Sequence, residues 1–366
     1  MFIPLNLSSL IKMGRQEDST SNFSNTTVVT ASLLLGIVLP LFYALLRYLF
    51  HPALISRLPI EYEEEVLLES TSSSDKKDDL SADHRPILSI VIPAYNEEER
   101  LLIMFADAFK FFQQEREQIR KQLGREAIGT FEFIIVDDGS TDQTCSIVKG
   151  TILSQMKPQS SISSNATDSL KLIRFKRNRG KGAAVKIGML HATGEYILMV
   201  DADGATDIRD LFKLLSIMTE MQQQQQDTQR PIVVIGSRAH LQEAAAVERS
   251  KMRTLLMYGF QFCVAMFCSR RIKDTQCGFK LFTSSAARML FSNLHLQRWA
   301  FDIELVAMTE LLQIPIAEVG VRWREVDGSK LDTGSKWRLI FVSLGMLRDM
   351  ICVRLCYTLG FWKLKN

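Results

Sequence analysis

The sequence predicts an α/β protein in which helices cover both faces of a mostly parallel sheet. Two observations favour this class: short apolar runs of strand length recur between residues 87 and 237, and segments of helical pattern separate them. Strands that alternate with helices usually pair in parallel, because each intervening helix carries the chain back across the sheet. The expected strands cover residues 87–93, 131–137, 170–175, 195–200 and 231–237.

The composition excludes two broad classes. Of the 366 residues, 46% are hydrophobic, which is enough for a packed core and excludes a disordered chain. The net charge is only +3, so we expect no nucleic-acid partner. The six cysteines show no CxxC pair and no metal-type spacing. Free thiols in a reducing compartment are the simplest interpretation.

An apolar stretch near the N-terminus predicts a membrane anchor. Residues 28–46 carry no charge, and their number suits a membrane-spanning helix. After an N-terminal segment of residues 1–27, we therefore expect one transmembrane helix over 28–50, which Pro40 would kink. A cleaved signal peptide is the alternative, although no small-residue cleavage pattern follows. Basic residues flank the stretch on both sides and leave its orientation open.

The stretch after the anchor is acidic and rich in serine, a composition that does not bury a core. We therefore expect a polar linker over residues 51–85 and a folded domain over residues 86–330.

Two later segments indicate contact with a membrane. Residues 254–269 are uncharged but shorter than the roughly 20 residues that a span needs, so an interfacial or buried helix is expected there. From residue 331 to 366 the chain is basic and rich in aromatic residues, a pattern typical of a segment that lies on an anionic membrane.

Two aspartates close the apolar run of residues 196–200. Asp201 and Asp203 stand two residues apart, so in an extended segment their side chains point the same way and can share one cation. Carboxylate oxygens at this spacing suit Mg²⁺ or Mn²⁺ that carries a diphosphate. The alternative is a polar turn that caps a helix beginning near Asp207.

The other strand ends also carry polar groups. Glu97 follows the first strand, Gly139 permits a tight turn after the second, and Lys181 lies in a glycine-containing loop after the third. Taken singly, these features are ordinary helix caps and turns. Because the carboxyl ends of parallel strands meet at one edge of a sheet, the sequence predicts a site there for a nucleoside diphosphate and a metal ion.

At this point the chain resembles a known family. The segments SIVIPAYNEEERL, IIVDDGSTDQT, NRGKGAAVKIGM and DADGAT are similar to the nucleotide-sugar-binding half of the inverting family 2 glycosyltransferases, which have the GT-A fold, a Rossmann-like architecture. That family includes the polyprenyl-phosphate hexosyltransferases. Later segments, among them GSRAH, DTQCGFKLF and RWAFDIELV, resemble more closely the members that transfer glucose to dolichyl phosphate. Mannosyl-transferring relatives often have a glutamine metal ligand where this chain has Ala205.

The resemblance implies roles for individual residues. Asp203, assisted by Asp201, would hold Mg or Mn. Asp203 would act in catalysis together with Arg238 and Lys280, whose charges suit the phosphates of donor and acceptor. The residues implied to bind the nucleotide sugar are Pro93, Tyr95, Glu97, Asp137, Asp138, Gly139, Lys181 and Asp201.

The same resemblance places the acceptor lipid beside Arg253, Arg238, Lys280 and Asp302. Arg253 is equally consistent with a cation that flanks a membrane segment. Asp302 and Glu304 stand where related enzymes have a general base, but a helix starting at Phe301 would favour acidic residues in its first turn in any case.

The implied function is transfer of glucose from UDP-glucose to dolichyl phosphate with inversion, giving dolichyl β-D-glucosyl phosphate for lipid-linked oligosaccharide assembly in protein N-glycosylation. The expected location is the endoplasmic reticulum membrane, crossed once, with the catalytic domain in the cytosol. A mannosyltransferase that uses GDP-mannose is one alternative. A catalytically silent membrane scaffold with the same fold is another.

Overall fold

A computed structural model of the chain describes residues 39–69, 85–124, 129–157, 168–225, 230–239, 259, 272–326 and 336–365. The chain divides into two units, residues 1–48 and 49–366, and the second carries the sheet. In the first unit, residues 39–48 are helical. Among the residues just given, no helix combines the length and hydropathy that a membrane span requires. Residues 28–38 of the expected anchor lie outside that set.

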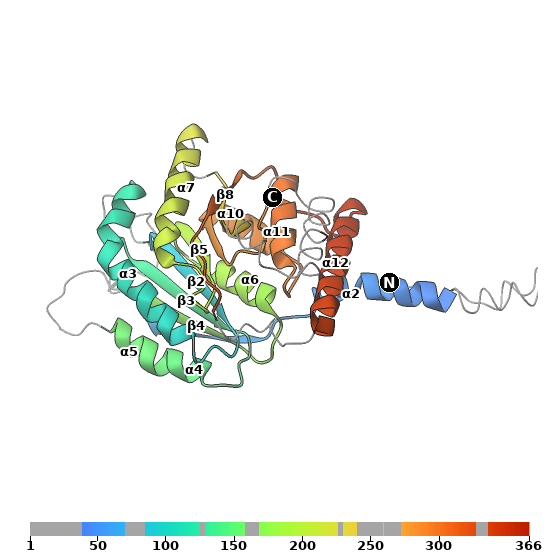
Figure 1. Cartoon of the computed structure of the whole chain (residues 1–366), viewed down its shortest axis with the longest axis horizontal. Coiled ribbons are helices and arrows are strands. Elements are labelled where there is room, and N and C mark those ends of the chain that lie inside the picture. Colours follow the sequence, from blue (N-terminus) through green and yellow to red (C-terminus); the bar gives the residue numbers. More distant parts are fainter. Residues whose placement is uncertain are drawn as a thin grey trace, which may run out of the picture. The chain divides into compact units, whose positions relative to one another are not determined.

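The described part of the second unit contains an eight-stranded sheet in the order β1-β4-β3-β2-β5-β7-β6-β8. Figure 1 shows the neighbours β4, β3, β2 and β5 side by side. The neighbours β4-β3-β2-β5 pair in parallel, as do β6 and β8, whereas β7 is antiparallel to both β5 and β6. The expected strands correspond to β2 to β6, and the sheet is mixed. The strands are β1 (Tyr62–Leu68), β2 (Leu88–Ala94), β3 (Phe131–Asp137), β4 (Ser169–Phe175), β5 (Tyr196–Val200), β6 (Val233–Ser237), β7 (Phe279–Thr283) and β8 (Ile316–Gly320).

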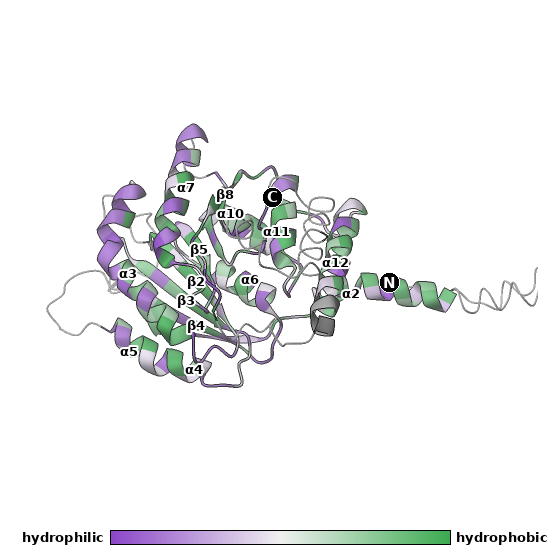
Figure 2. Ribbon diagram, viewed as in Figure 1, coloured by the Kyte–Doolittle hydropathy of each residue, from purple (hydrophilic) through white to green (hydrophobic). Residues whose placement is uncertain are grey.

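Helices cover both faces of the sheet, as expected. Side chains of β5 alternate between two cores: Ile197 and Met199 pack with α6, α10, α11 and α12, whereas Leu198 and Val200 pack with α3 and α7. Figure 2 shows hydrophobic strands between helices that carry more hydrophilic residues. The helices are α2 (His51–Ile55), α3 (Leu101–Gln122), α4 (Thr144–Ile147), α5 (Leu153–Met156), α6 (Lys181–His191), α7 (Leu211–Gln225), α10 (Ser284–Asn293), α11 (Phe301–Leu311) and α12 (Lys336–Thr358), with a π-helical turn at Val148–Ile152 and a 3₁₀ turn at Ile208–Asp210.

The stretch expected to be a polar linker differs in the structure. Residues 51–55 form α2, and β1 pairs antiparallel with β4 at the edge of the sheet. The glutamates of β1 remain at the surface, where Glu65 forms an ion pair with Lys149. An acidic strand is stable at this position because an edge strand needs to bury only one face. Residues 70–84 lie outside the described part.

The C-terminal tail is a helix that joins the domain core. Cys352, Val353 and Cys356 of α12 and the following Trp362 are buried in the core that contains α6 and α11. Exposed apolar side chains remain at Phe341, Leu344, Leu359 and Phe361. The tail is therefore partly a core element, a role that its basic composition does not predict. Apart from Gly259, the expected helix over 254–269 lies outside the described residues.

Candidate active site

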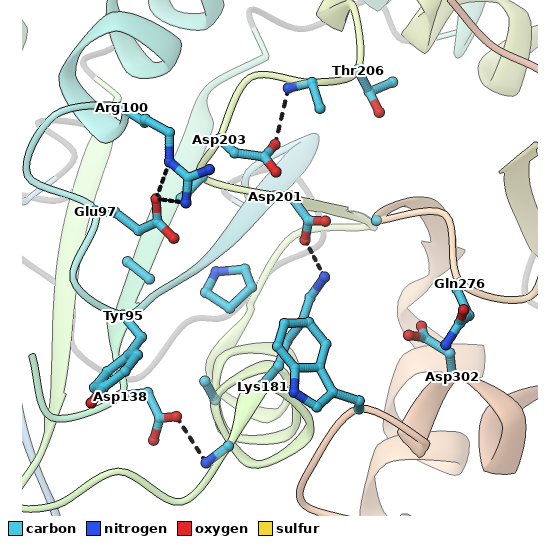
Figure 3. A pocket seen from close by; sticks show the side chains of 18 of the residues that line it. Tyr95, Glu97, Arg100, Asp138, Lys181, Asp201, Asp203, Thr206, Gln276 and Asp302 are labelled. Atoms are coloured by element: carbon cyan, nitrogen blue, oxygen red, sulfur yellow. Dashed lines mark hydrogen bonds and ion pairs between the residues drawn. The ribbon is translucent and has the colours of Figure 1, made fainter. Parts of the chain in front are cut away.

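A cavity of about 510 Å³ opens at the carboxyl ends of β2 and β5 (Figure 3). Its walls come from the loops that follow β2, β3, β4 and β5, which are the four strand ends singled out in the sequence. Segments around Arg238, Gln276, Asp302 and Trp323 complete it. In Figure 3, Tyr95 and Asp138 lie on one side of the cavity and Gln276 and Asp302 on the other. The structure thus brings together residues from distant parts of the chain.

The loop after β2 is fixed by the loop after β3. Asn96 has a left-handed backbone with φ of 53°, and its N–H donates to the hydroxyl of Ser140 at 2.8 Å. The Asn96 side-chain oxygen accepts from the N–H of Thr141 at 2.8 Å. This exchange holds Tyr95 and Glu97 in the cavity wall, and their contact with a nucleotide stays a prediction.

Asp138 organises the loop before α6. Its carboxylate accepts the N–H of Arg179 at 2.7 Å, the N–H of Gly180 at 2.8 Å and the side-chain amide of Asn178 at 2.9 Å. Burial nevertheless raises its pKa to about 6. The loop after β3 can approach the loop before α6 this closely because Gly139 has φ of 71° and no side chain. A Cβ at Gly139 would lie 2.8 Å from the backbone of Arg177.

Asp137 does not line the cavity, although the sequence places it among the nucleotide-binding residues. Its side chain is fully buried and accepts the N–H of Ser140 at 2.9 Å. The second carboxylate oxygen lies 3.6 Å from Nε of Arg174. Asp137 therefore shapes the turn that carries Asp138, and direct contact with a nucleotide stays a prediction.

The two aspartates after β5 both face the cavity. Asp201 lies 2.6 Å from Nζ of Lys181, while an oxygen of Asp203 accepts the N–H of Ala205 at 2.9 Å. Burial and the neighbouring charge of Asp201 raise the pKa of Asp203 above its ordinary value. Burial alone would lower the pKa of Lys181, but the carboxylates of Asp201, Asp302 and Asp203 raise it overall. The site thus concentrates negative charge that a cation would relieve.

The same two carboxylates are the candidate metal ligands. Within the described part of the chain, no group of three or more histidine, cysteine, aspartate or glutamate side chains is arranged to hold an ion. Asp201 and Asp203 are adjacent in Figure 3 and present hard oxygens to one cavity. They fit an ion such as Mg²⁺ that takes its other ligands from a substrate phosphate and water.

Arg238 lines the cavity as expected, and a buried acid fixes its orientation. Its Nε and Nη2 donate to the two oxygens of Asp274 at 2.8 and 2.9 Å. Burial alone would raise the pKa of Asp274, but the guanidinium holds it below its ordinary value. The guanidinium also lies 5.5 Å from the centre of the Trp323 ring. A cation held in this way presents a fixed charge to the cavity.

Lys280 does not face the cavity, contrary to the role that the resemblance implies. Its side chain is 1% exposed, and Nζ donates to the carbonyl of Cys277 and to Oδ1 of Asp302, each at 2.6 Å. Asp302 itself lines the cavity. Lys280 therefore lies behind the residues that line the cavity, because β7 directs its side chain into the protein interior. Arg253, the other expected acceptor residue, lies outside the described residues.

Glu304, which the sequence could not separate from Asp302, does not line the cavity. Its fully buried carboxylate accepts the N–H groups of His295 and Leu296 and the hydroxyl of Tyr357 on α12 at 3.0 Å. Glu304 therefore joins α11 to the preceding loop and to α12, and only Asp302 faces the cavity.

Several cavity residues are absent from the predicted set. Gln276, Arg298, Trp299 and Trp323 lie in segments that carry the family resemblance, but none belongs to one of the four strand ends singled out in the sequence. The only signal available for them was membership of those segments. Arg100 follows the first strand and pairs with Glu97 at 2.6 Å.

The chain is similar in sequence to known proteins. The family model described as Glycosyl transferase family 2 matches residues 89–277. A dolichyl-phosphate beta-glucosyltransferase of Dictyostelium discoideum is 44% identical over 280 residues, which cover 76% of this chain and 77% of the relative. A relative of the same name from Homo sapiens is 41% identical over 76% of this chain and 78% of the relative. Another, from Saccharomyces cerevisiae, is 36% identical over 93% of this chain and 96% of the relative.

Among solved structures, glucosyl-3-phosphoglycerate synthase from Mycobacterium tuberculosis in complex with Mn2+ and UDP-glucose covers 73% of this chain and 80% of its own. Its sequence identity is 16% and its TM-score 0.40. A similarity at this level bears on neither the metal nor the substrate of this chain.

Proposed function

The chain belongs to glycosyl transferase family 2 and, within it, to the dolichyl-phosphate beta-glucosyltransferases, and from this premise we propose that it transfers glucose from UDP-glucose to dolichyl phosphate with inversion. The product is dolichyl β-D-glucosyl phosphate, a sugar donor for lipid-linked oligosaccharide assembly in protein N-glycosylation. One structural observation carries the proposal: a single cavity at the sheet edge holds two carboxylates, Asp201 and Asp203, beside the cations Lys181 and Arg238.

The chemistry of the acceptor explains why such a site suffices. A phosphate monoester has a second pKa of about 6, so it carries nearly two negative charges at pH 7 and is already a nucleophile. An acceptor phosphate oxygen attacks the anomeric carbon of glucose from the face opposite UDP. The bond from that carbon to the UDP oxygen breaks, and its electron pair leaves with UDP. No proton has to be removed, so no general base is required.

The protein's task is to position the reactants and to stabilise the charge on the departing diphosphate. Arg238, held by Asp274, and Lys181 at the start of α6 supply fixed positive charge at the cavity. A divalent cation held by Asp203 and Asp201 would act as a Lewis acid on the diphosphate oxygens. Tyr95, Glu97 and Asp138 form the side of the cavity assigned to the nucleoside.

The proposal includes a location. The anchor over residues 28–50 crosses the endoplasmic reticulum membrane once and leaves the catalytic domain in the cytosol. Exposed apolar side chains on α2 and α12, among them Leu54, Phe341 and Leu344, support contact of the domain with a bilayer surface. The described cysteines Cys145, Cys277, Cys352 and Cys356 are free, which suits a reducing compartment.

The activity is tested by supplying membranes that hold the full chain with dolichyl phosphate and either labelled UDP-glucose or labelled GDP-mannose. We expect label to enter lipid only from UDP-glucose, in β linkage. An Asp203→Ala variant, which removes a metal ligand and no core contact, is the matched control and should be inactive with its fold intact. Label that enters lipid only from GDP-mannose would instead establish the mannosyltransferase. No transfer from either donor by a folded chain would favour the scaffold.

Topology is tested separately by glycosylation mapping. With a cytosolic domain, the sequon at Asn165 stays unmodified, whereas Asn6 becomes modified if the N-terminus is lumenal. Endoglycosidase-sensitive glycan on Asn165 would overturn the cytosolic assignment.

A further inference from the structure

The cavity cations differ in whether a carboxylate already pairs with them. Arg100 pairs with Glu97, Lys181 with Asp201 and Arg238 with Asp274. Arg298 also lines the cavity, and its side chain is exposed. Among the residues that the structure describes, no carboxylate forms an ion pair with it. Its guanidinium is therefore available to an anionic ligand without displacing an internal partner.

The loop that carries Arg298 is held firmly. The backbone carbonyl of Gln297 accepts the N–H of Ala183 in α6 at 2.9 Å. A Cβ added at Gly182 would lie 2.6 Å from the carbonyl oxygen of Leu296, so loop and helix are in direct contact. Glu304 binds the other end of the loop through the N–H groups of His295 and Leu296. Arg298 is thus an exposed side chain on a fixed backbone, which lowers the entropic cost of binding through it.

The same loop borders the apolar elements α2 and α12. Gln297 lies within 3.5 Å of the carbonyl of Ile55 in α2. His295 of the same loop stacks on the ring of Trp362, which follows α12, with the two ring centres 4.0 Å apart. Each of these two helices carries an exposed apolar side chain, Leu54 on α2 and Leu344 on α12. Arg298 therefore lies between the cavity and the part of the domain best suited to a lipid surface.

Of the residues expected to bind the acceptor, the three that the structure describes do not fill this role. Lys280 is buried behind the residues that line the cavity, Arg238 is held by Asp274 and serves the departing diphosphate in the proposed reaction, and Asp302 repels an anion. A phosphate dianion that enters beside Asp302 needs a cation near the mouth of the cavity.

We propose that Arg298 binds the phosphate of the acceptor lipid at the mouth of the cavity, where the bidentate guanidinium receives a phosphate monoester whose apolar chain extends toward α2 and α12. This inference rests on the proposed glucosyl transfer and names the residue that recognises its acceptor. Trp299, 41% exposed, stands next to Arg298 in the cavity wall and shields the bound phosphate from water.

The test compares Arg298→Ala with the wild-type chain in steady-state transfer assays, varying dolichyl phosphate and UDP-glucose in turn. A charge-assisted hydrogen bond contributes about 1.5–3 kcal/mol, so the KM for dolichyl phosphate should rise roughly 10- to 100-fold. The KM for UDP-glucose should change less than about threefold. Arg288→Ala is the matched control, because Arg288 is an exposed arginine of α10 that does not line the cavity.

A second arm separates phosphate recognition from attraction to an anionic membrane. With a short, water-soluble prenyl phosphate and no bilayer, Arg298→Ala should raise the acceptor KM by a similar factor. Arg298→Lys, which keeps the charge but loses the planar fork, should give an intermediate rise and reports on the same contact if the alanine variant folds poorly.

An unchanged acceptor KM, an effect confined to anionic membranes, or equal rises for donor and acceptor would each overturn the assignment. These results presuppose transfer by the wild-type chain. Absence of that transfer counts instead against the proposed function.

Discussion

Nζ of Lys280 lies 2.6 Å from Oδ1 of Asp302, and of these two buried side chains only Asp302 reaches the cavity wall. Burial raises the pKa of Asp302, while the neighbouring ammonium of Lys280 opposes the rise. Lys280 therefore influences the cavity through Asp302. It is a positioning residue in this arrangement, and the two side chains should be tested as a pair.

Replacing Lys280 by Met should destabilise the fold, because it leaves the Asp302 carboxylate buried without its cation. Breaking a buried pair in this way typically costs about 3–5 kcal/mol of unfolding free energy. Urea unfolding measures the loss. The double variant Lys280→Met, Asp302→Leu should recover much of it, since no charge is left unpaired. Additive losses in the double variant would show that the two groups are not coupled.

Asp302→Asn tests whether the reaction needs a general base. Since a phosphate dianion is already a nucleophile, we expect this variant to keep substantial activity. Its pH profile should still follow ionisation of the acceptor phosphate, with a pKa of about 6. Arg238→Ala should cost far more, because it removes a fixed charge at the cavity. If Asp302→Asn proves as inactive as Asp203→Ala while UDP-glucose binding is unchanged, the base-free mechanism has to be abandoned.

Gly278→Ala should move a functional side chain without disturbing the core. A Cβ at this position would lie 1.9 Å from Oδ2 of Asp201, and a carboxylate can rotate away where backbone cannot. We therefore expect a large loss of transfer with little change in the temperature of unfolding. Gly150→Ala is the control, because nothing lies within 4 Å of its added Cβ. Wild-type activity in Gly278→Ala would show that the position of Asp201 is unimportant.

Asp138 should make the stability of the fold depend on pH. Burial raises its pKa to about 6, whereas an unfolded aspartate titrates near 3.9. Between these values the unfolded chain loses its proton first, so the free energy of unfolding falls as pH rises from about 4 to 6. The expected fall is of order 3 kcal/mol. Thermal unfolding across this pH range, compared with Asp138→Asn, isolates the contribution. An identical pH dependence in both proteins would assign the effect to other groups.

Part of the fold could be predicted from local pattern. The strands β2 to β6 can be predicted because each is a short apolar run bounded by polar or glycine residues. The edge strand β1 cannot be predicted in this way, because its glutamates point to solvent and give it the composition of a linker. The role of α12 was hidden in the same way: its basic residues suggested a surface segment, yet Val353 and Cys356 belong to the core.

The sequence by itself determined that acidic and basic residues follow consecutive strands, and parallel pairing then required those strand ends to meet at one edge. It therefore predicted Glu97, Lys181, Asp201 and Asp203 as neighbours. Only the tertiary structure decided whether the side chains of the later segments face the cavity or the protein interior. Lys280 and Arg298 are both cations in segments that resemble the family, yet Lys280 points from β7 into the interior and Arg298 stands exposed on a loop packed against α6. The physical reason is that a side chain's direction follows from the pairing of β7 with β5 and β6 and from the contact of that loop with α6. Both are contacts between residues far apart in the chain, and local residue pattern does not encode them.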